Sequence, residues 1–359
     1  MFTDRRANSL PTRRRRQPWP AKRPFKILSL DGGGIRGIYT AEILRRCEET
    51  FCDGAPLARY FDMIAGTSTG GIIALGLGLG IPTAEIAGFY RDDGRKIFPP
   101  LPGGWIGSIR RLIRSLGGPK LVHEELEAAL QRRFVDHLLG ESMTRLVIPA
   151  FMMPKTEIAV FKTDHHEDFK NDHKTPMWKV ARATSAAPTY LKGLEHEESG
   201  KIFIDGGVWA NNPIMVALVD SVTAYEIGFD QVEIFSIGTG NAPFALRKPD
   251  VFRGLIAWRE AIKAAMFLTT DNATAQAKLL LGPDRCLRIE PSEADSMIEM
   301  DDYDAAFARL PDRARAHFQE KRAEISQFFE SVAAPRERHY RADRVADGEA
   351  QTLSEPDSD

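Results

Sequence analysis

Gly66-Thr67-Ser68-Thr69-Gly70 places a serine between two glycines, at a point where the sequence pattern changes. The run before it, Phe61–Ala65, is short and mostly apolar and predicts a buried strand, whereas Gly71–Leu75 predicts a buried helix. A strand that turns directly into a helix strains the backbone at the turn, and flanking glycines give that turn room. We therefore expect Ser68 at a helix N-terminus, where unpaired N–H groups favour a developing negative charge. An ordinary tight turn remains the alternative.

A second glycine-rich stretch follows another apolar run. Phe25–Leu30 predicts a buried strand that leads into Asp31-Gly32-Gly33-Gly34-Ile35-Arg36-Gly37 and then into a helical pattern over 38–49. Consecutive glycines let several backbone N–H groups converge on one anion. In a serine hydrolase such a loop forms an oxyanion hole, in which the loss of one donor costs about 100- to 1000-fold in rate. A phosphate cradle is the alternative, although the loop lacks the Lys-Ser/Thr ending of a P-loop.

A third motif, Asp205-Gly206-Gly207, comes directly after the apolar run Lys201–Ile204. An aspartate at the carboxyl end of a buried strand faces the same crevice as the other two loops if the strands are parallel. Asp205 is then a candidate general base. A turn residue is the alternative interpretation.

Taken in order, D-G-G-G-x-R-G, G-T-S-T-G and D-G-G resemble the signature of patatin-like phospholipases over about residues 25–290. Ala183–Pro188 and Gly207–Pro213 resemble further segments of that family. The resemblance implies a Ser-Asp dyad without a catalytic histidine, formed here by Ser68 and Asp205. It also implies that the glycine loop supplies the oxyanion hole. The loop residues concerned are Gly32, Gly33 and Gly34, with Arg36 beside them as a supporting residue.

Apolar runs alternate with helical patterns from Phe25 onward, which predicts an α/β fold with a mainly parallel sheet. The resemblance implies a patatin-like three-layer sandwich, followed by a C-terminal helical segment. The expected organisation is a basic flexible tail (1–24), a catalytic domain (25–290), a helical extension of it (291–334) and a polar tail (335–359). Further strands are expected at 146–153, 158–161, 202–204, 232–237 and 287–289, and further helices at 83–91, 122–134, 177–186, 213–227 and 252–280.

Composition limits the partners and the compartment. The 359 residues carry a net charge of -2, so no global field attracts nucleic acid. The three cysteines are odd in number and lack a C-x-x-C spacing, which favours a reducing, cytoplasmic compartment over a disulfide scaffold or a zinc site. No apolar core follows the basic N-terminus, so a secretory signal is not expected. We expect no cofactor and no metal.

Two segments suggest contact with a membrane. Residues 1–24 contain eight Lys and Arg residues among prolines, which suits either a solvated tail or attachment to anionic lipid. Trp105–Leu116 places its apolar residues on one helical arc opposite Arg110, Arg111 and Arg114. That pattern indicates either a packed surface helix or an interfacial lid. The expected location is cytoplasmic, and peripheral at the inner membrane when the enzyme is active.

The histidines form no recognisable ligand set. His165, His166 and His173 lie in a polar stretch, 164–172, that predicts a solvated loop, with a metal site as the alternative. The others are scattered, and one of them completing a conventional triad is a further alternative; they are His123, His137, His196, His317 and His339.

The function expected from these observations is acyl-ester hydrolysis on membrane phospholipids. A lysophospholipase or lipid acyltransferase that uses the same residues is the first alternative. A nucleotide-binding regulatory protein is an alternative of another class and depends on the glycine loop. Some compact bacterial members of the family are effectors of anti-phage signalling that a cyclic dinucleotide activates, which supplies a further hypothesis. Oligomerisation is compatible with all of these.

Overall fold

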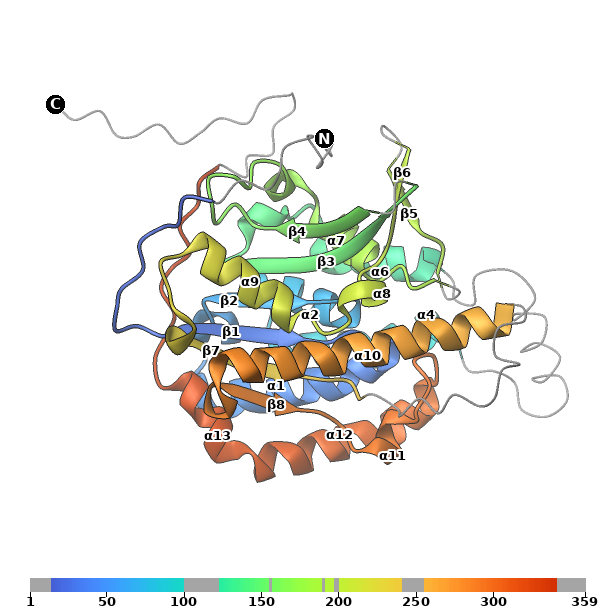
Figure 1. Cartoon of the computed structure of the whole chain (residues 1–359). Coiled ribbons are helices and arrows are strands. Elements are labelled where there is room, and N and C mark those ends of the chain that lie inside the picture. Colours follow the sequence, from blue (N-terminus) through green and yellow to red (C-terminus); the bar gives the residue numbers. More distant parts are fainter. Residues whose placement is uncertain are drawn as a thin grey trace, which may run out of the picture.

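The structure, a computed structural model, describes residues 14–99, 123–154, 157–188, 191–196, 200–240 and 255–340. Within them, eight strands form one mixed sheet in the order β5-β6-β3-β2-β1-β7-β8, with β4 paired to β3 (Figure 1). The strands are β1 (Phe25–Leu30), β2 (Met63–Gly66), β3 (Arg145–Met153), β4 (Glu157–Lys162), β5 (Leu194–His196), β6 (Lys201–Asp205), β7 (Val232–Ile237) and β8 (Cys286–Ile289).

The centre of the sheet is parallel. Strands β3, β2, β1, β7 and β8 all run in one direction, with β1 in the middle. All six residues of β1 are buried. A strand that is covered on both faces lacks the alternation of polar and apolar residues, which explains the continuous apolar run in the sequence.

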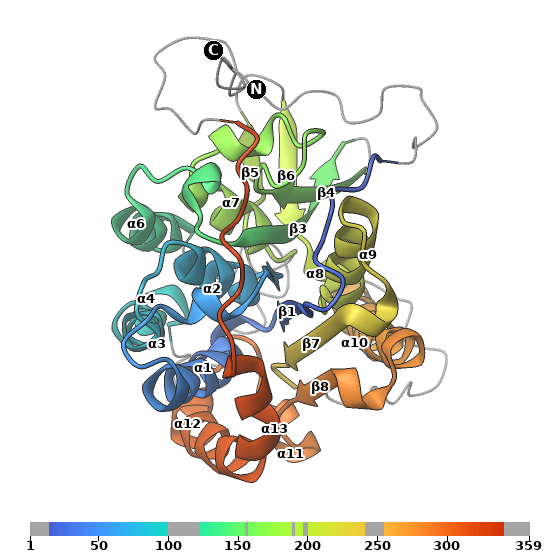
Figure 2. The ribbon, with the colours of Figure 1, turned by 90° about the vertical axis from the view of Figure 1, so that its left-hand side faces the viewer.

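Helices cover both faces of the sheet and make three layers (Figure 2). One face carries α1 (Gly37–Phe51), α2 (Thr69–Gly78), α3 (Thr83–Asp92), α4 (Gly94–Ile97), α6 (His123–Phe134), α7 (Met177–Thr184) and α12 (Tyr303–Glu320). The other carries α8 (Gly207–Ala210), α9 (Ile214–Ala224) and α10 (Leu255–Leu281). Two short helices complete the C-terminal part, α11 (Glu293–Ser296) and α13 (Arg322–Ser326). The predicted α/β sandwich with a mainly parallel sheet is confirmed.

The other three strands of the sheet, β4, β5 and β6, join it through antiparallel pairs, which sequence reasoning did not foresee. Strands β4 and β6 both run antiparallel to β3, and β5 is antiparallel to β6. Strand β3 pairs with β4 over Val147–Met152, with β2 over Arg145–Val147 and with β6 over Ala150–Met153. Because β4 occupies one edge of β3 throughout, β2 and β6 must share the other edge.

This arrangement corrects the expectation that Asp205 ends a parallel strand. Strand β3 continues beyond the end of β2, and β6 runs back along the same edge toward β2. The carboxyl ends of β2 and β6 therefore point at each other across a short gap. Pro149 of β3 lies opposite that gap, where a proline costs no ladder hydrogen bond because no strand is there to accept one.

Part of the expected N-terminal tail is packed on the body, which corrects the prediction of a flexible segment over 1–24. Gln17 forms a parallel bridge with Tyr225, and the backbone N–H of Gln17 donates to Ala224 O at 2.8 Å. The Trp19 ring packs against the rings of Phe25 and Tyr225, with centroid distances of 4.8 and 5.4 Å. Residues 1–13 lie outside the described part of the chain.

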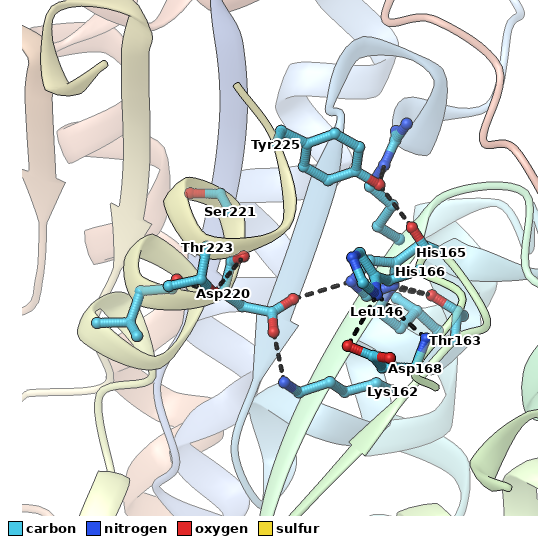
Figure 3. A network of polar contacts seen from close by, with 12 residues as sticks. Leu146, Lys162, Thr163, His165, His166, Asp168, Asp220, Ser221, Thr223 and Tyr225 are labelled. Atoms are coloured by element: carbon cyan, nitrogen blue, oxygen red, sulfur yellow. Dashed lines mark hydrogen bonds and ion pairs between the residues drawn. The ribbon is translucent and has the colours of Figure 1, made fainter. Parts of the chain in front are cut away.

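The stretch 164–172 is only in part the solvated loop that its polarity suggested, because 167–171 are mostly exposed whereas 164–166 are buried. His165, His166 and His173 are fully buried. Figure 3 shows the reason: His165 Nε2 donates to Asp220 Oδ2 at 2.9 Å, and the other carboxylate oxygen accepts from Lys162. Burial lowers the pKa of His165 to about 4 and keeps it neutral. Among the described residues, no cluster of three or more His, Cys, Asp or Glu is placed to hold a metal.

The beginning of the expected polar tail is fixed to this same loop. Arg336 forms a buried ion pair with Asp164, and Tyr340 N donates to Asp164 Oδ2 at 2.9 Å. Residues 341–359 lie outside the described residues, as does the predicted amphipathic segment Trp105–Leu116. Across the described helices, none combines the length and the apolar character that crossing a bilayer requires.

Candidate active site

Ser68 lies at a strained turn between β2 and α2. Its φ of 54° and ψ of −122° are unusual for a residue with a side chain. The flanking glycines are required by close contacts, since a Cβ on Gly66 would clash with the carbonyl of Gly70, and a Cβ on Gly70 with that of Leu30. The strand–turn–helix expected around Ser68 is therefore present.

Asp205 ends β6 directly beside this serine. Ser68 Oγ donates to Asp205 Oδ2 at 2.6 Å, and the amide of Gly207 donates to Oδ1 at 2.7 Å. Asp205 is 4% exposed, and no other charged group among the described residues bonds to its carboxylate. The structure thus brings together the two residues that the sequence proposed as a dyad.

The environment of Asp205 makes it a better base than a free carboxylate. Burial raises its pKa to about 6, although the hydrogen bonds from Ser68 and Gly207 oppose that rise. An aspartate with this pKa is still ionised at neutral pH and binds a proton more readily than one with the ordinary value near 3.9.

The glycine loop between β1 and α1 faces the dyad, but its three glycines are not equivalent. The Gly32 amide donates to Asn211 O at 3.0 Å and is occupied. The amides of Gly33 and Gly34 have no backbone acceptor within the described chain, and both residues line the pocket beside Ser68. A Cβ on Gly33 would clash with Thr239, so this position requires glycine. The predicted oxyanion donors are thereby reduced to Gly33 and Gly34.

The ends of this loop are held by two arginines. Arg288 of β8 forms a bidentate pair with Asp31 at 2.8 and 2.6 Å. Arg36 is buried and donates to the carbonyls of Gly240 and Ser296 at 3.0 and 3.1 Å. Arg36 therefore links the loop to the carbonyls of Gly240 and Ser296, and it is not among the described residues that line the pocket.

Sequence reasoning gave no role to the residues after Asp205, although it noted their segment. Thr67 Oγ1 donates to Ala210 O at 2.7 Å, and Asn211 O accepts the Gly32 amide. Asn211 Nδ2 in turn donates to Thr270 Oγ1 of α10 at 3.2 Å. Ala210 and Asn211 thus connect the serine turn, the glycine loop and α10 through hydrogen bonds.

An apolar pocket opens from the dyad between α2, α3, α4 and α6. Apart from the dyad, the glycines and two small polar residues, Thr69 and Ser185, its walls are apolar. They comprise Ile72, Phe89, Tyr90, Ile97, Phe98, Leu126, Ala187, Pro188, Leu191, Val208, Met266 and Met300. No histidine is among the described lining residues, so the alternative of a His-containing triad has no support here.

A serine at a strained turn, bonded to a buried carboxylate and opening onto an apolar pocket, defines the site of a serine acyl hydrolase. Residues 28–218 match the family described as patatin-like phospholipase. The chain belongs to this family.

Three relatives illustrate the match. A protein of Pseudomonas aeruginosa named cGAMP-activated phospholipase is 35% identical over 70% of this chain and 75% of its own length. One of Escherichia coli with the same name is 33% identical over 62% of this chain and 64% of its own. Patatin-like protein 2 of Arabidopsis thaliana is 34% identical over 69% of this chain and 66% of its own length.

A solved structure, that of VipD from Legionella pneumophila, overlaps with a TM-score of 0.37 at 13% identity. The overlap covers 82% of this chain and 68% of that one. The fold assignment rests on the strand order and layers described above.

Proposed function

We propose that this chain hydrolyses the acyl esters of membrane phospholipids with Ser68 as nucleophile and Asp205 as general base. The observation that carries the proposal is the 2.6 Å hydrogen bond between these side chains at the mouth of the apolar pocket. The pocket suits an aliphatic acyl chain, and the ester carbonyl then lies beside the Gly33 and Gly34 amides.

Catalysis proceeds in two acyl-transfer steps. Asp205 takes the hydroxyl proton of Ser68 while Oγ attacks the ester carbonyl, and the oxyanion is held by the two glycine amides and the α2 N-terminus. When the tetrahedral intermediate collapses, the departing lysophospholipid alkoxide takes the proton from Asp205. Water, deprotonated by the same carboxylate, then attacks the acyl-enzyme, and the fatty acid leaves as Ser68 Oγ takes the proton back from Asp205.

Fatty-acid release from phospholipid vesicles tests this function with wild type, Ser68→Ala and Asp205→Asn. We expect both variants to lose activity by at least about 1000-fold, since each removes a member of one catalytic unit. Ser185→Ala is the control, because Ser185 also lines the pocket but its hydroxyl bonds to Ala181 O. Substantial activity in either dyad variant would refute the dyad.

We further propose that a cyclic dinucleotide activates the enzyme as part of anti-phage defence at the cytoplasmic face of the inner membrane. Support comes from the names of the Pseudomonas and Escherichia relatives, which are called cGAMP-activated. The test repeats the vesicle assay with a panel of cyclic di- and trinucleotides. Release that requires one nucleotide supports the proposal, and equal release without any nucleotide contradicts it.

The alternative activities use the same site. A lysophospholipase would prefer monoacyl substrates, and an acyltransferase would transfer the acyl group from Ser68 to an added alcohol. A nucleotide-binding function of the glycine loop has less support. The loop faces the dyad, and the described residues that line the pocket include no Lys or Arg to bind phosphate. Comparison of diacyl and monoacyl substrates, with and without an acceptor, separates these activities.

A further inference from the structure

The segment at the end of α7 contacts both members of the dyad through hydrogen bonds. Thr184 Oγ1 accepts the backbone N–H of Ser68 at 3.0 Å. Two residues later, Ala186 O accepts the backbone N–H of Asp205 at 3.0 Å. One short segment therefore fixes the backbone of the nucleophile and that of the base relative to each other.

The direction of the hydrogen bonds at Thr184 is determined by its partners. The amide of Ser68 can only donate, and the carbonyl of Pro149, 2.6 Å from Thr184 Oγ1, can only accept. The hydroxyl must therefore give its proton to Pro149 and turn a lone pair toward Ser68. A side chain without a hydroxyl group cannot make both bonds.

The place of Pro149 in the sheet explains why a side chain is needed there. Pro149 lies opposite the gap between β2 and β6, where no strand supplies a donor for its carbonyl. Thr184 is fully buried, so water does not replace its hydroxyl. Its methyl group packs on Gly71, where a Cβ would lie 2.7 Å from Thr184 Cγ2, and this contact fixes the rotamer.

The backbone that Thr184 holds is the strained one. Ser68 has its φ in the left-handed region, a strained conformation that persists only where the surroundings enforce it. The α2 helix holds the residues after Ser68, whereas the bond from Thr184 acts on the amide of Ser68 itself. Loss of that bond leaves the turn free to relax and to move Oγ away from Asp205.

We propose that Thr184 is a positioning residue, whose hydroxyl group links Pro149 to the Ser68 amide and holds the nucleophile within hydrogen-bonding distance of Asp205. This inference rests on the proposed dyad. Thr184 touches neither the substrate nor the reacting atoms in this scheme, and it acts through the backbone of Ser68.

The test compares Thr184→Val, which keeps the shape and removes the hydroxyl, with Thr184→Ser, which keeps the hydroxyl. Steady-state hydrolysis of a soluble short-chain ester gives kcat and KM, and titration with a fluorophosphonate counts the active sites. We expect Thr184→Val to lower kcat per active site by about 100-fold with little change in KM, as a displaced reacting group does. The kcat per active site of Thr184→Ser should stay within about threefold of wild type, because this substitution weakens only the contact of the methyl group with Gly71.

The acid limb of the pH profile is an independent readout. The Ser68 hydrogen bond lowers the pKa of Asp205, so a displaced Ser68 should move the limb of Thr184→Val upward in pH. Thr144→Val is the matched control, since Thr144 is buried, donates to Phe61 O at 2.8 Å and directly precedes β3, at its N-terminal end. It should lower the melting temperature without changing kcat.

Two outcomes would overturn the inference: a kcat for Thr184→Val within twofold of wild type, or equal losses in Thr184→Ser and Thr184→Val. A failure of the dyad itself is recognised separately, because Ser68→Ala would then retain activity.

Discussion

Asp205 carries a negative charge at a buried position where that charge costs the folded protein free energy. Its only described partners are the neutral hydroxyl group of Ser68 and the amide of Gly207. No cation among the described residues offsets the desolvation, so the pKa of Asp205 rises to about 6. The same desolvation that strengthens the base also weakens the fold.

The raised pKa of Asp205 should make activity depend on pH. Asp205 must be ionised to accept the Ser68 proton, so kcat/KM on a soluble ester should rise with pH and level off above an apparent pKa of about 6. A profile already level at pH 4.5, as expected for an ordinary aspartate, would contradict the assigned environment.

The same raised pKa should make the stability of the fold depend on pH. The pKa of Asp205 is higher in the folded state, about 6, than the ordinary value of 3.8 that it has in the unfolded chain, so the protein loses stability as pH rises through this window. Above pH 6 the cost amounts to about 3 kcal/mol. Asp205→Asn should therefore unfold at higher urea concentration than wild type at pH 8, with the difference shrinking toward pH 5. An inactive variant of lower stability at pH 8 would count against the argument.

Among the secondary-structure elements, the loop between β1 and α1 sets the position of the proposed oxyanion donors. Gly33 lies so close to Thr239 that a methyl group has no space. We expect Gly33→Ala to displace the Gly33 and Gly34 amides and to lower kcat by about 100- to 1000-fold with KM little changed. Gly88→Ala in α3 is the control, because its Cβ would meet only Asp92 Oδ2 at 3.7 Å, and a helical alanine is favourable. Equal activity of both variants would contradict a role for the loop amides.

How far the sequence predicted this site depends on the range of each interaction. The turn at Ser68 and the glycine loop are local patterns, with a strand, a turn and a helix within about a dozen residues, and both were predicted. The antiparallel course of β6 was not, because short strands of one composition pair in either direction. Thr184 and Arg288 act across more than 100 positions of the chain, and nothing in their immediate sequence marks their partners.

At the scale of the whole molecule, both described chain ends meet at the loop after β4. Arg14 and Lys162 pair with Asp220, while Gln17 Nε2 lies 2.9 Å from His339 Nε2. Composition alone predicted tails, because the arginines and histidines of these segments looked solvated. The attachment of these segments depends on Asp220 of α9 and on Asp164 in the loop after β4, which only the folded chain brings near.

Asp220→Asn tests how much these contacts at the two chain ends stabilise the fold. The substitution leaves Lys162, which is mostly buried, and the nearby Arg14 without a counter-charge. We expect a loss of about 3–5 kcal/mol in the free energy of unfolding. Asp271→Asn, an exposed position in α10, should change it by less than about 0.5 kcal/mol. A change of less than 1 kcal/mol for Asp220→Asn would show that the chain ends are held by other contacts.

The meeting of β2 and β6 on one edge of β3 also has a consequence for the order of events during biosynthesis. The serine is translated 137 residues before its aspartate. A nascent chain that ends before β6 already contains the proposed nucleophile, the glycine loop and most of the pocket, but it lacks the proposed base. Catalytic competence thus arises only when a late strand docks beside an early one, which delays hydrolysis until most of the sandwich has been synthesised.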